Sequence, residues 1–118
     1  MFRKVADQGS AGAQFNLGLM YADGQGVPQD YQEAVKWFRK AAEQGDADAQ
    51  HNLGALYVKG QGVPQDYILA HMWINLSAAQ SNEKAIKNRD IVASKMTPAQ
   101  IAEAQRLARE WKPKKARH

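Results

Sequence analysis

The feature that most constrains this chain is a segment that occurs twice, 36 residues apart. Residues 17–31 return as residues 53–67, and aligning residues 2–38 with residues 38–74 gives 23 identities in 37 positions. A fixed period of this length is typical of proteins built from stacked structural repeats. Because one such unit is too small to bury its own apolar face, neighbouring units must share a core. The repeat therefore predicts a stack of similar units.

The apolar residues of each unit recur at helical spacing, which predicts two helices per unit. In the first unit this pattern predicts a helix over about residues 11–22, and the glycines of segment 23–26 predict the turn that ends it. Asp30 is then expected to cap a second helix with Trp37 on its buried face. Trp73 occupies the same place in the second unit. We therefore expect both indoles to lie in the shared core.

Two glycines lie inside the predicted first helices of the units. Gly18 and Gly54 are separated by the repeat spacing, and a glycine inside a helix costs about 1 kcal/mol relative to alanine. Their recurrence predicts a helix crossing that is too close for a side chain.

The repeat pattern decays in the third unit. Arg89 and Asp90 replace the leucine and glycine of the first two units, while Thr97 and Gln100 predict a capping box that opens a last helix. We therefore expect a single solenoid over residues 1–111, followed by a basic tail. Its parts are a half-repeat 1–9, repeats 10–45 and 46–81, a polar capping hairpin 82–111 and the tail 112–118.

The first residues match the end of a repeat. Residues 2–9 resemble residues 38–45, so the chain opens in the middle of a second helix whose partner helix is absent. Two interpretations follow: the chain is a fragment of a longer array, or its open N-terminal edge mediates self-association. As written, the chain has no apolar secretory signal and is expected in the cytoplasm, but an exported parent stays open if the chain is a fragment.

Composition and charge exclude several kinds of site and of partner. The chain has no cysteine, which excludes disulfides and thiolate metal sites, and no apolar run approaches the about 20 residues of a membrane span. The net charge of +4 is uneven, because residues 1–83 hold 6 basic and 9 acidic residues (−3) and residues 84–118 hold 10 and 3 (+7). The basic tail has no interleaved aromatic residues, so we expect no specific nucleic-acid binding.

No catalytic or cofactor-binding arrangement is recognisable. His51, His71 and His118 have no cysteine or carboxylate partner at metal-ligand spacing. The Gly-Gln-Gly turns lack the Lys-Ser/Thr of a phosphate-binding loop, and no Gly-x-Ser-x-Gly motif occurs. We therefore expect no enzyme activity and no cofactor or metal.

A longer motif carries a family resemblance. Residues 13–45 contain Ala-x-x-x-Leu-Gly-x-x-Tyr-x-x-Gly-x-Gly-Val-x-x-Asp-x-x-x-Ala-x-x-Trp and a closing Ala-Ala-x-x-Gly. Residues 49–82 repeat it with Ser77-Ala78 for the Ala-Ala pair and Ser81 for the last glycine. This pattern resembles the Sel-one-like repeat family, and residues 82–111 look like the hairpin that follows such repeats in bacterial members. The resemblance implies an all-α right-handed superhelix, similar to tetratricopeptide arrays, that acts as a protein-interaction scaffold.

The same resemblance implies that the first helix of each unit lines a concave groove. Asn16, Asn52 and Asn88 lie there at two successive intervals of 36 residues. One hypothesis is that their amides hydrogen-bond the backbone of an extended peptide, and the other is that they brace neighbouring repeats. The expected partner-binding groove comprises Phe15, Asn16, Leu19, His51, Asn52, Ala55, Lys87 and Asn88.

A group of cations lies near one end of this groove. Lys84, Lys87, Lys95 and Arg89 form a candidate site for an acidic segment or a C-terminal carboxylate of a partner, with an ordinary solvated face as the other interpretation. The sequence thus favours a noncatalytic scaffold that binds a peptide or partner protein in its concave groove. A structural array that associates through its N-terminal edge is the alternative.

Overall fold

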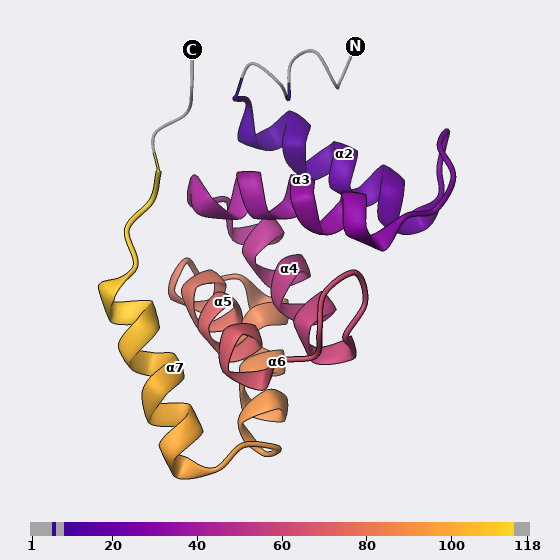
Figure 1. Ribbon diagram of the computed structural model, residues 1–118. Coiled ribbons are helices and arrows are strands. Elements are labelled where there is room, and N and C mark those ends of the chain that lie inside the picture. Colours follow the sequence, from indigo (N-terminus) through magenta and orange to yellow (C-terminus); the bar gives the residue numbers. More distant parts are fainter. Residues whose placement is uncertain (1–5, 7–8, 115–118) are drawn as a thin grey trace.

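The computed structural model describes residue 6 and residues 9–114, and all regular structure in those residues is helical (Figure 1). Six helices follow one another there, and the all-α helical-repeat fold expected from the sequence is confirmed. The helices are α2 (Ala11–Asp23), α3 (Tyr31–Glu43), α4 (Ala47–Lys59), α5 (Tyr67–Ala79), α6 (Glu83–Ala93) and α7 (Pro98–Glu110).

The helices stack in adjacent pairs. α2 packs on α3 and α4 packs on α5, while α3 against α4 and α5 against α6 join one unit to the next (Figure 1). The resulting stack measures 44 × 28 × 23 Å. None of the helices in the described residues is both long and apolar enough to cross a membrane.

α7 departs from this alternation, because it lies along α5 instead of forming a close pair with α6 (Figure 1). The indoles of Trp73 and Trp111 meet edge to face, with ring centroids 6.1 Å apart and an interplanar angle of 74°. α6 carries Arg89 and Asp90 where the earlier units have leucine and glycine. α6 therefore lacks the leucine that packs in the core and the glycine that lets a second helix come close.

The two predicted core tryptophans are buried. Trp37 is 1% exposed and Trp73 is 6% exposed, so the expectation is confirmed. Trp37 packs with Ala6, Ala13 and Leu17, whereas Trp73 belongs to a larger cluster of buried residues from α3 to α6.

The two helical glycines lie where a neighbouring helix comes too close for a side chain, as predicted. A Cβ atom on Gly18 would lie 2.6 Å from the Phe38 ring. A Cβ atom on Gly54 would lie 2.5 Å from Ile74 and 3.0 Å from the Ala70 carbonyl oxygen. Each glycine thus allows the two helices of its unit to approach closely.

Buried glutamines link each unit to the one before it, a feature that our sequence analysis missed. Gln14 Nε2 donates to the Ala6 carbonyl at 3.0 Å, and Gln50 Nε2 donates to the Ala42 carbonyl at 3.2 Å. The two glutamines are 36 residues apart, so the period contained the signal. Ile86 replaces the glutamine in the third unit and is 40% exposed.

The helix starts follow the same period. Ser10, Asp46 and Asn82 each accept a hydrogen bond from the backbone N–H three residues later, which satisfies an otherwise unpaired donor. Burial raises the pKa of the Asp46 carboxyl above its usual value. At α7 the predicted capping box of Thr97 and Gln100 is present.

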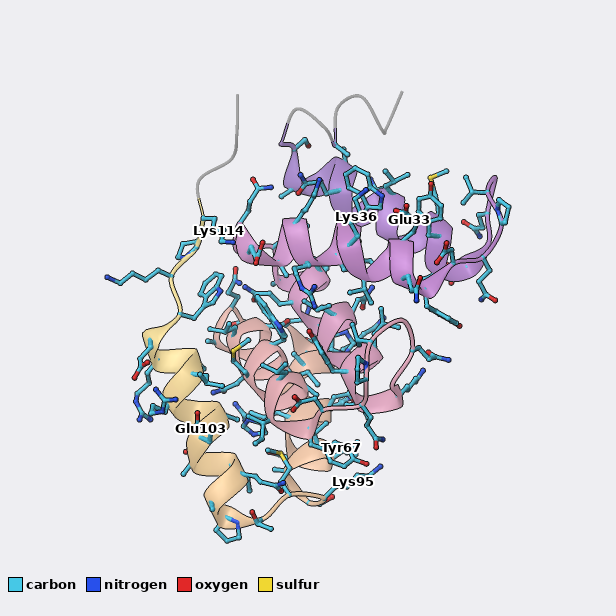
Figure 2. All side chains as sticks on the ribbon, in the orientation of Figure 1. Glu33, Lys36, Tyr67, Lys95, Glu103 and Lys114 are labelled. Atoms are coloured by element: carbon cyan, nitrogen blue, oxygen red, sulfur yellow. The ribbon has the colours of Figure 1, made fainter. Side chains whose placement is uncertain are left out.

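The chain after α7 returns to the first repeat. The Lys114 backbone N–H donates to the Glu43 carbonyl at 2.6 Å, and Lys114 Nζ lies 3.3 Å from the Glu43 carboxylate (Figure 2). The described part of the tail therefore lies against the end of α3. Most of the expected half-repeat, residues 1–5 and 7–8, and the tail residues 115–118 lie outside the described residues.

Candidate functional site

Two hollows lie on the face formed by the first helices of the units, α2, α4 and α6. The α2–α4 hollow has a volume of about 210 Å³ and is lined by Leu19, Ala22, Asp23, Tyr31, Phe38, Asn52, Ala55, Leu56, Lys59 and Gln61. The α4–α6 hollow has a volume of about 160 Å³ and is lined by Ala55, Val58, Lys59, Ile74, Asn88, Ile91 and Val92.

The two hollows adjoin along α4, because Ala55 and Lys59 line both of them. We refer to the pair of hollows as the groove. Most of its lining is apolar, and each hollow contains one asparagine side chain. Ile91, at 57% exposure, is the most exposed large apolar residue among those that the structure describes.

Four of the eight residues expected from the sequence line the groove: Leu19, Asn52, Ala55 and Asn88. The exposed Asn16 and Lys87 line neither hollow. Phe15 is half-buried and packs against Phe38, with ring centroids 5.8 Å apart, and so supports the wall of the α2–α4 hollow.

His51, the eighth expected residue, connects two of the asparagines. Asn88 Nδ2 lies 2.8 Å from His51 Nε2, and His51 Nδ1 lies 3.1 Å from Asn52 Oδ1. An amide nitrogen can only donate, so Nε2 accepts and the ring proton on Nδ1 donates to Asn52. The imidazole thereby joins α4 to α6 and fixes the orientation of both amides.

This network uses only part of each amide. The Nδ2 group of Asn52 and the Oδ1 atom of Asn88 have no hydrogen-bond partner among the described residues. One donor and one acceptor therefore remain free on the two asparagines that line the groove. Asn16 has no part in this network.

The cations near the groove are largely unpaired. Lys59, Lys84, Lys87 and Lys95 form no ion pair with any described residue. Of the predicted cation group, only Arg89 forms an ion pair with a described residue, with its Nε 3.7 Å from the Asp90 carboxylate.

A buried histidine lies between α5 and α6. His71 is 3% exposed, and its Nδ1 atom has no hydrogen-bond partner in the described residues. Burial lowers the pKa of His71, and the nearby Arg89 guanidinium lowers it further. The side chain is therefore a neutral component of the core.

A third hollow lies on a different face, between α5 and α7. Its volume is about 360 Å³, and it is lined by Asn75, Leu76, Ala79, Gln105, Ala108 and Arg109. None of the residues expected in the groove lies here. Across the described residues there is no group of three or more histidine, aspartate or glutamate side chains that could hold a metal ion.

These observations define a helical-repeat solenoid with a groove along its first helices. Residues 11–46 and 47–82 each match the family model of the Sel1 repeat, so the chain belongs to the Sel1 repeat family. Proteins of this family are generally noncatalytic scaffolds for protein interactions.

Two solved structures are similar to this chain. One is c5321 of Escherichia coli, described as a protective antigen of uropathogenic strains with an SLR fold; it is 42% identical with a TM-score of 0.90, covering 93% of this chain and 24% of that one. The other is a Sel1 repeat protein from Oxalobacter formigenes, 42% identical with a TM-score of 0.73, covering 76% of this chain and 37% of that one. The chain thus spans well under half of either protein. No curated protein sequence matches the chain.

Proposed function

We propose that the chain is a noncatalytic scaffold that binds a peptide segment of a partner protein in its groove. The observation that carries this proposal is the pair of adjoining hollows on α2, α4 and α6, which share Ala55 and Lys59. Binding sites are concave and mainly apolar, with a few polar groups that orient the ligand. The groove has these properties.

The asparagines supply the orienting groups. The free Nδ2 of Asn52 is a donor for a peptide carbonyl, and the free Oδ1 of Asn88 is an acceptor for a peptide N–H. One donor and one acceptor suit the main chain of an extended segment, whatever its side chains. Because His51 already holds both amides, less conformational entropy is lost on binding.

The alternative function expected from the sequence is self-association through the N-terminal edge. That edge consists of residues 1–9, most of which lie outside the described residues. All the residues that line the groove are described, so the proposal is argued from the groove.

The proposal is tested by selecting a phage-displayed library of random dodecapeptides on the immobilised wild-type protein. Fluorescence anisotropy then gives the affinity of each enriched peptide. Ala55 lines both hollows, so a bulky arginine at this position obstructs the groove where they adjoin, and Ala55→Arg should weaken binding by about tenfold or more. The matched control is Ala79→Arg, which places the same side chain in the α5–α7 hollow and should leave the affinity unchanged.

Circular dichroism melting of both variants shows whether the fold is retained. Peptides that bind Ala55→Arg as tightly as the wild type contradict the proposal. Loss of binding only in Ala79→Arg would move the site to the α5–α7 hollow.

A further inference from the structure

We propose that the α4–α6 hollow binds an acidic segment in which one bulky aliphatic or aromatic side chain has a carboxylate close to it in sequence. The inference rests on the proposed function and specifies the chemistry of the partner. It also gives the segment a direction, since its acidic part lies over α6 and not over α2.

The hollow accommodates one large apolar side chain. Its volume is about 160 Å³, and a dry apolar cavity of about 150 Å³ is large enough for benzene. Ala55, Val58, Ile74 and Val92 form an apolar lining, and Ile91 leaves much of its side chain in water. An inserted aliphatic or aromatic group covers this surface, which is favourable.

One lysine lines the same hollow, and two others belong to α6 or to the segment just after it. Lys59 lines it, and Lys87 precedes Ile91 by one helical turn. Lys95 comes two residues after Ala93, the last residue of α6. No acidic side chain lines this hollow, and the three ammonium groups have no ion pair among the described residues. The positive electrostatic potential of these lysines favours an acidic partner and raises its association rate.

The neighbouring hollow differs in charge. Asp23 lines the α2–α4 hollow together with Lys59, so that side of the groove is closer to neutral. An extended segment that spans both hollows therefore gains most when its carboxylates lie over α6. The difference between the two hollows sets the direction of the segment.

The test uses the peptides selected on the wild-type protein, and it compares two double variants of equal charge change. Lys59→Glu with Lys87→Glu reverses the cations at the hollow. Arg109→Glu with Lys112→Glu reverses two exposed cations at the end of α7 and just after it, where Arg109 lines the α5–α7 hollow and neither residue lines the groove. We expect Asp or Glu within about two positions of a bulky apolar residue in the wild-type selection, because one extended residue spans about 3.3 Å.

The affinity of these peptides should fall about tenfold or more in the first double variant and little in the second. Selection on the first variant should enrich Lys or Arg instead of Asp or Glu. Raising the salt from about 0.05 M to about 0.3 M should weaken wild-type binding. Ile91→Asp should weaken it as well, while Ile91→Leu should retain it. A random single-stranded oligonucleotide serves as the anionic control and should not displace the peptide.

The outcomes separate the two proposals. Peptides that lose binding in Ala55→Arg but show no acidic enrichment overturn this inference and leave the groove function standing. An affinity that charge reversal leaves unchanged also overturns the inference and spares the groove function. Displacement by the oligonucleotide overturns it too, because the site would then recognise charge alone. Peptides whose affinity is the same for Ala55→Arg and the wild type contradict both proposals, as does a library that yields no enriched sequence.

Discussion

The second helices of the two repeats, α3 and α5, have the same register and different surroundings. In α3 the face away from the core is polar, while the corresponding positions of α5 are apolar. The four pairs, each 36 residues apart, are Gln32 and Ile68, Glu33 and Leu69, Lys36 and Met72, and Lys40 and Leu76. A helix that is apolar on all sides is normally buried on all sides.

The cover of α5 is α7. Leu107, Ala108 and Trp111 of the last helix and its C-cap pack onto the core that contains α5, whereas in α3 the ammonium groups of Lys36 and Lys40 lie over the Trp37 ring, 5.1 and 4.7 Å from its centroid. In a repeat protein, the sequence differences between units therefore indicate what each unit packs against. Substitutions made separately in the two repeats test this.

The largest effect should come from the indoles. Trp37→Ala and Trp73→Ala should each lower the free energy of unfolding by about 3–5 kcal/mol, measured by urea denaturation, because both rings are buried. Trp73 and Trp111 should in addition show a coupling of about 0.5–1.5 kcal/mol in a double-mutant cycle, as edge-to-face rings do. The control cycle of Trp37 with Trp111 should be additive. An additive result for Trp73 with Trp111 would contradict the role of α7 as the cover of α5.

The next effect compares two turn glycines in the same repeat position. Gly26 and Gly62 have φ of +75° and +77°, so an alanine is strained at either one. At Gly26 the nearest heavy atom to an added Cβ is Met20 Cε at 3.6 Å, whereas at Gly62 the Cβ would collide with the Tyr31 carbonyl of the preceding unit. Gly26→Ala should cost about 1–2 kcal/mol, and Gly62→Ala about 1–3 kcal/mol more.

Chemical denaturation of the two alanine variants side by side measures the difference. Equal losses would mean that the turn moves away from the Tyr31 carbonyl without further cost, so that this close approach does not constrain the turn.

The parts of this fold that follow from short-range rules could be predicted from the sequence. The 36-residue period, the cap at Asp46, the capping box at Thr97 and the close approach at Gly54 each depend on a few neighbouring residues, and each is confirmed. The packing of α7 on α5 depends on segments that are distant in sequence. Its signal, the missing polar face of α5, is visible only when the two repeats are compared position by position.

Four of the eight expected residues line the groove, because the roles of the others depend on packing that periodicity does not show. Phe15 and His51 hold the same repeat position, so periodicity assigns them one role. Phe15 has the aromatic ring of Phe38 beside it, and the second repeat has Ile74 in place of that ring. His51 bonds Asn88 of the next unit instead. Which role such a residue takes depends on the side chains packed around it, in its own unit for Phe15 and in the next unit for His51.

A smaller effect should appear on the acid side of neutral pH. The lowered pKa of His71 means that the unfolded chain, with a histidine pKa near 6.5, binds the proton more readily than the folded one. The contribution of neutral His71 to the free energy of unfolding should therefore be fully present above about pH 6.5 and should decrease as the pH drops below it. α3 has Val35 at this position, so His71→Val should flatten the profile of unfolding free energy between about pH 7 and pH 5. An unchanged profile in the variant would assign the pH dependence to other groups.

The smallest effect should be a gain. Gly45 follows α3 with φ of +101°, and Gly9, 36 residues earlier, has φ of +97°, while Ser81 takes the same position after α5 with φ of +66°. A side chain in this left-handed region costs about 1–2 kcal/mol. Replacing it with glycine removes that strain, but glycine loses more conformational entropy on folding, which offsets about half of the gain. Ser81→Gly should thus raise the free energy of unfolding by up to about 1 kcal/mol. The reverse change, Gly45→Ser, should lower it. If both substitutions destabilise the protein, the second repeat has adapted to serine, and the end of α5 is not equivalent to the end of α3.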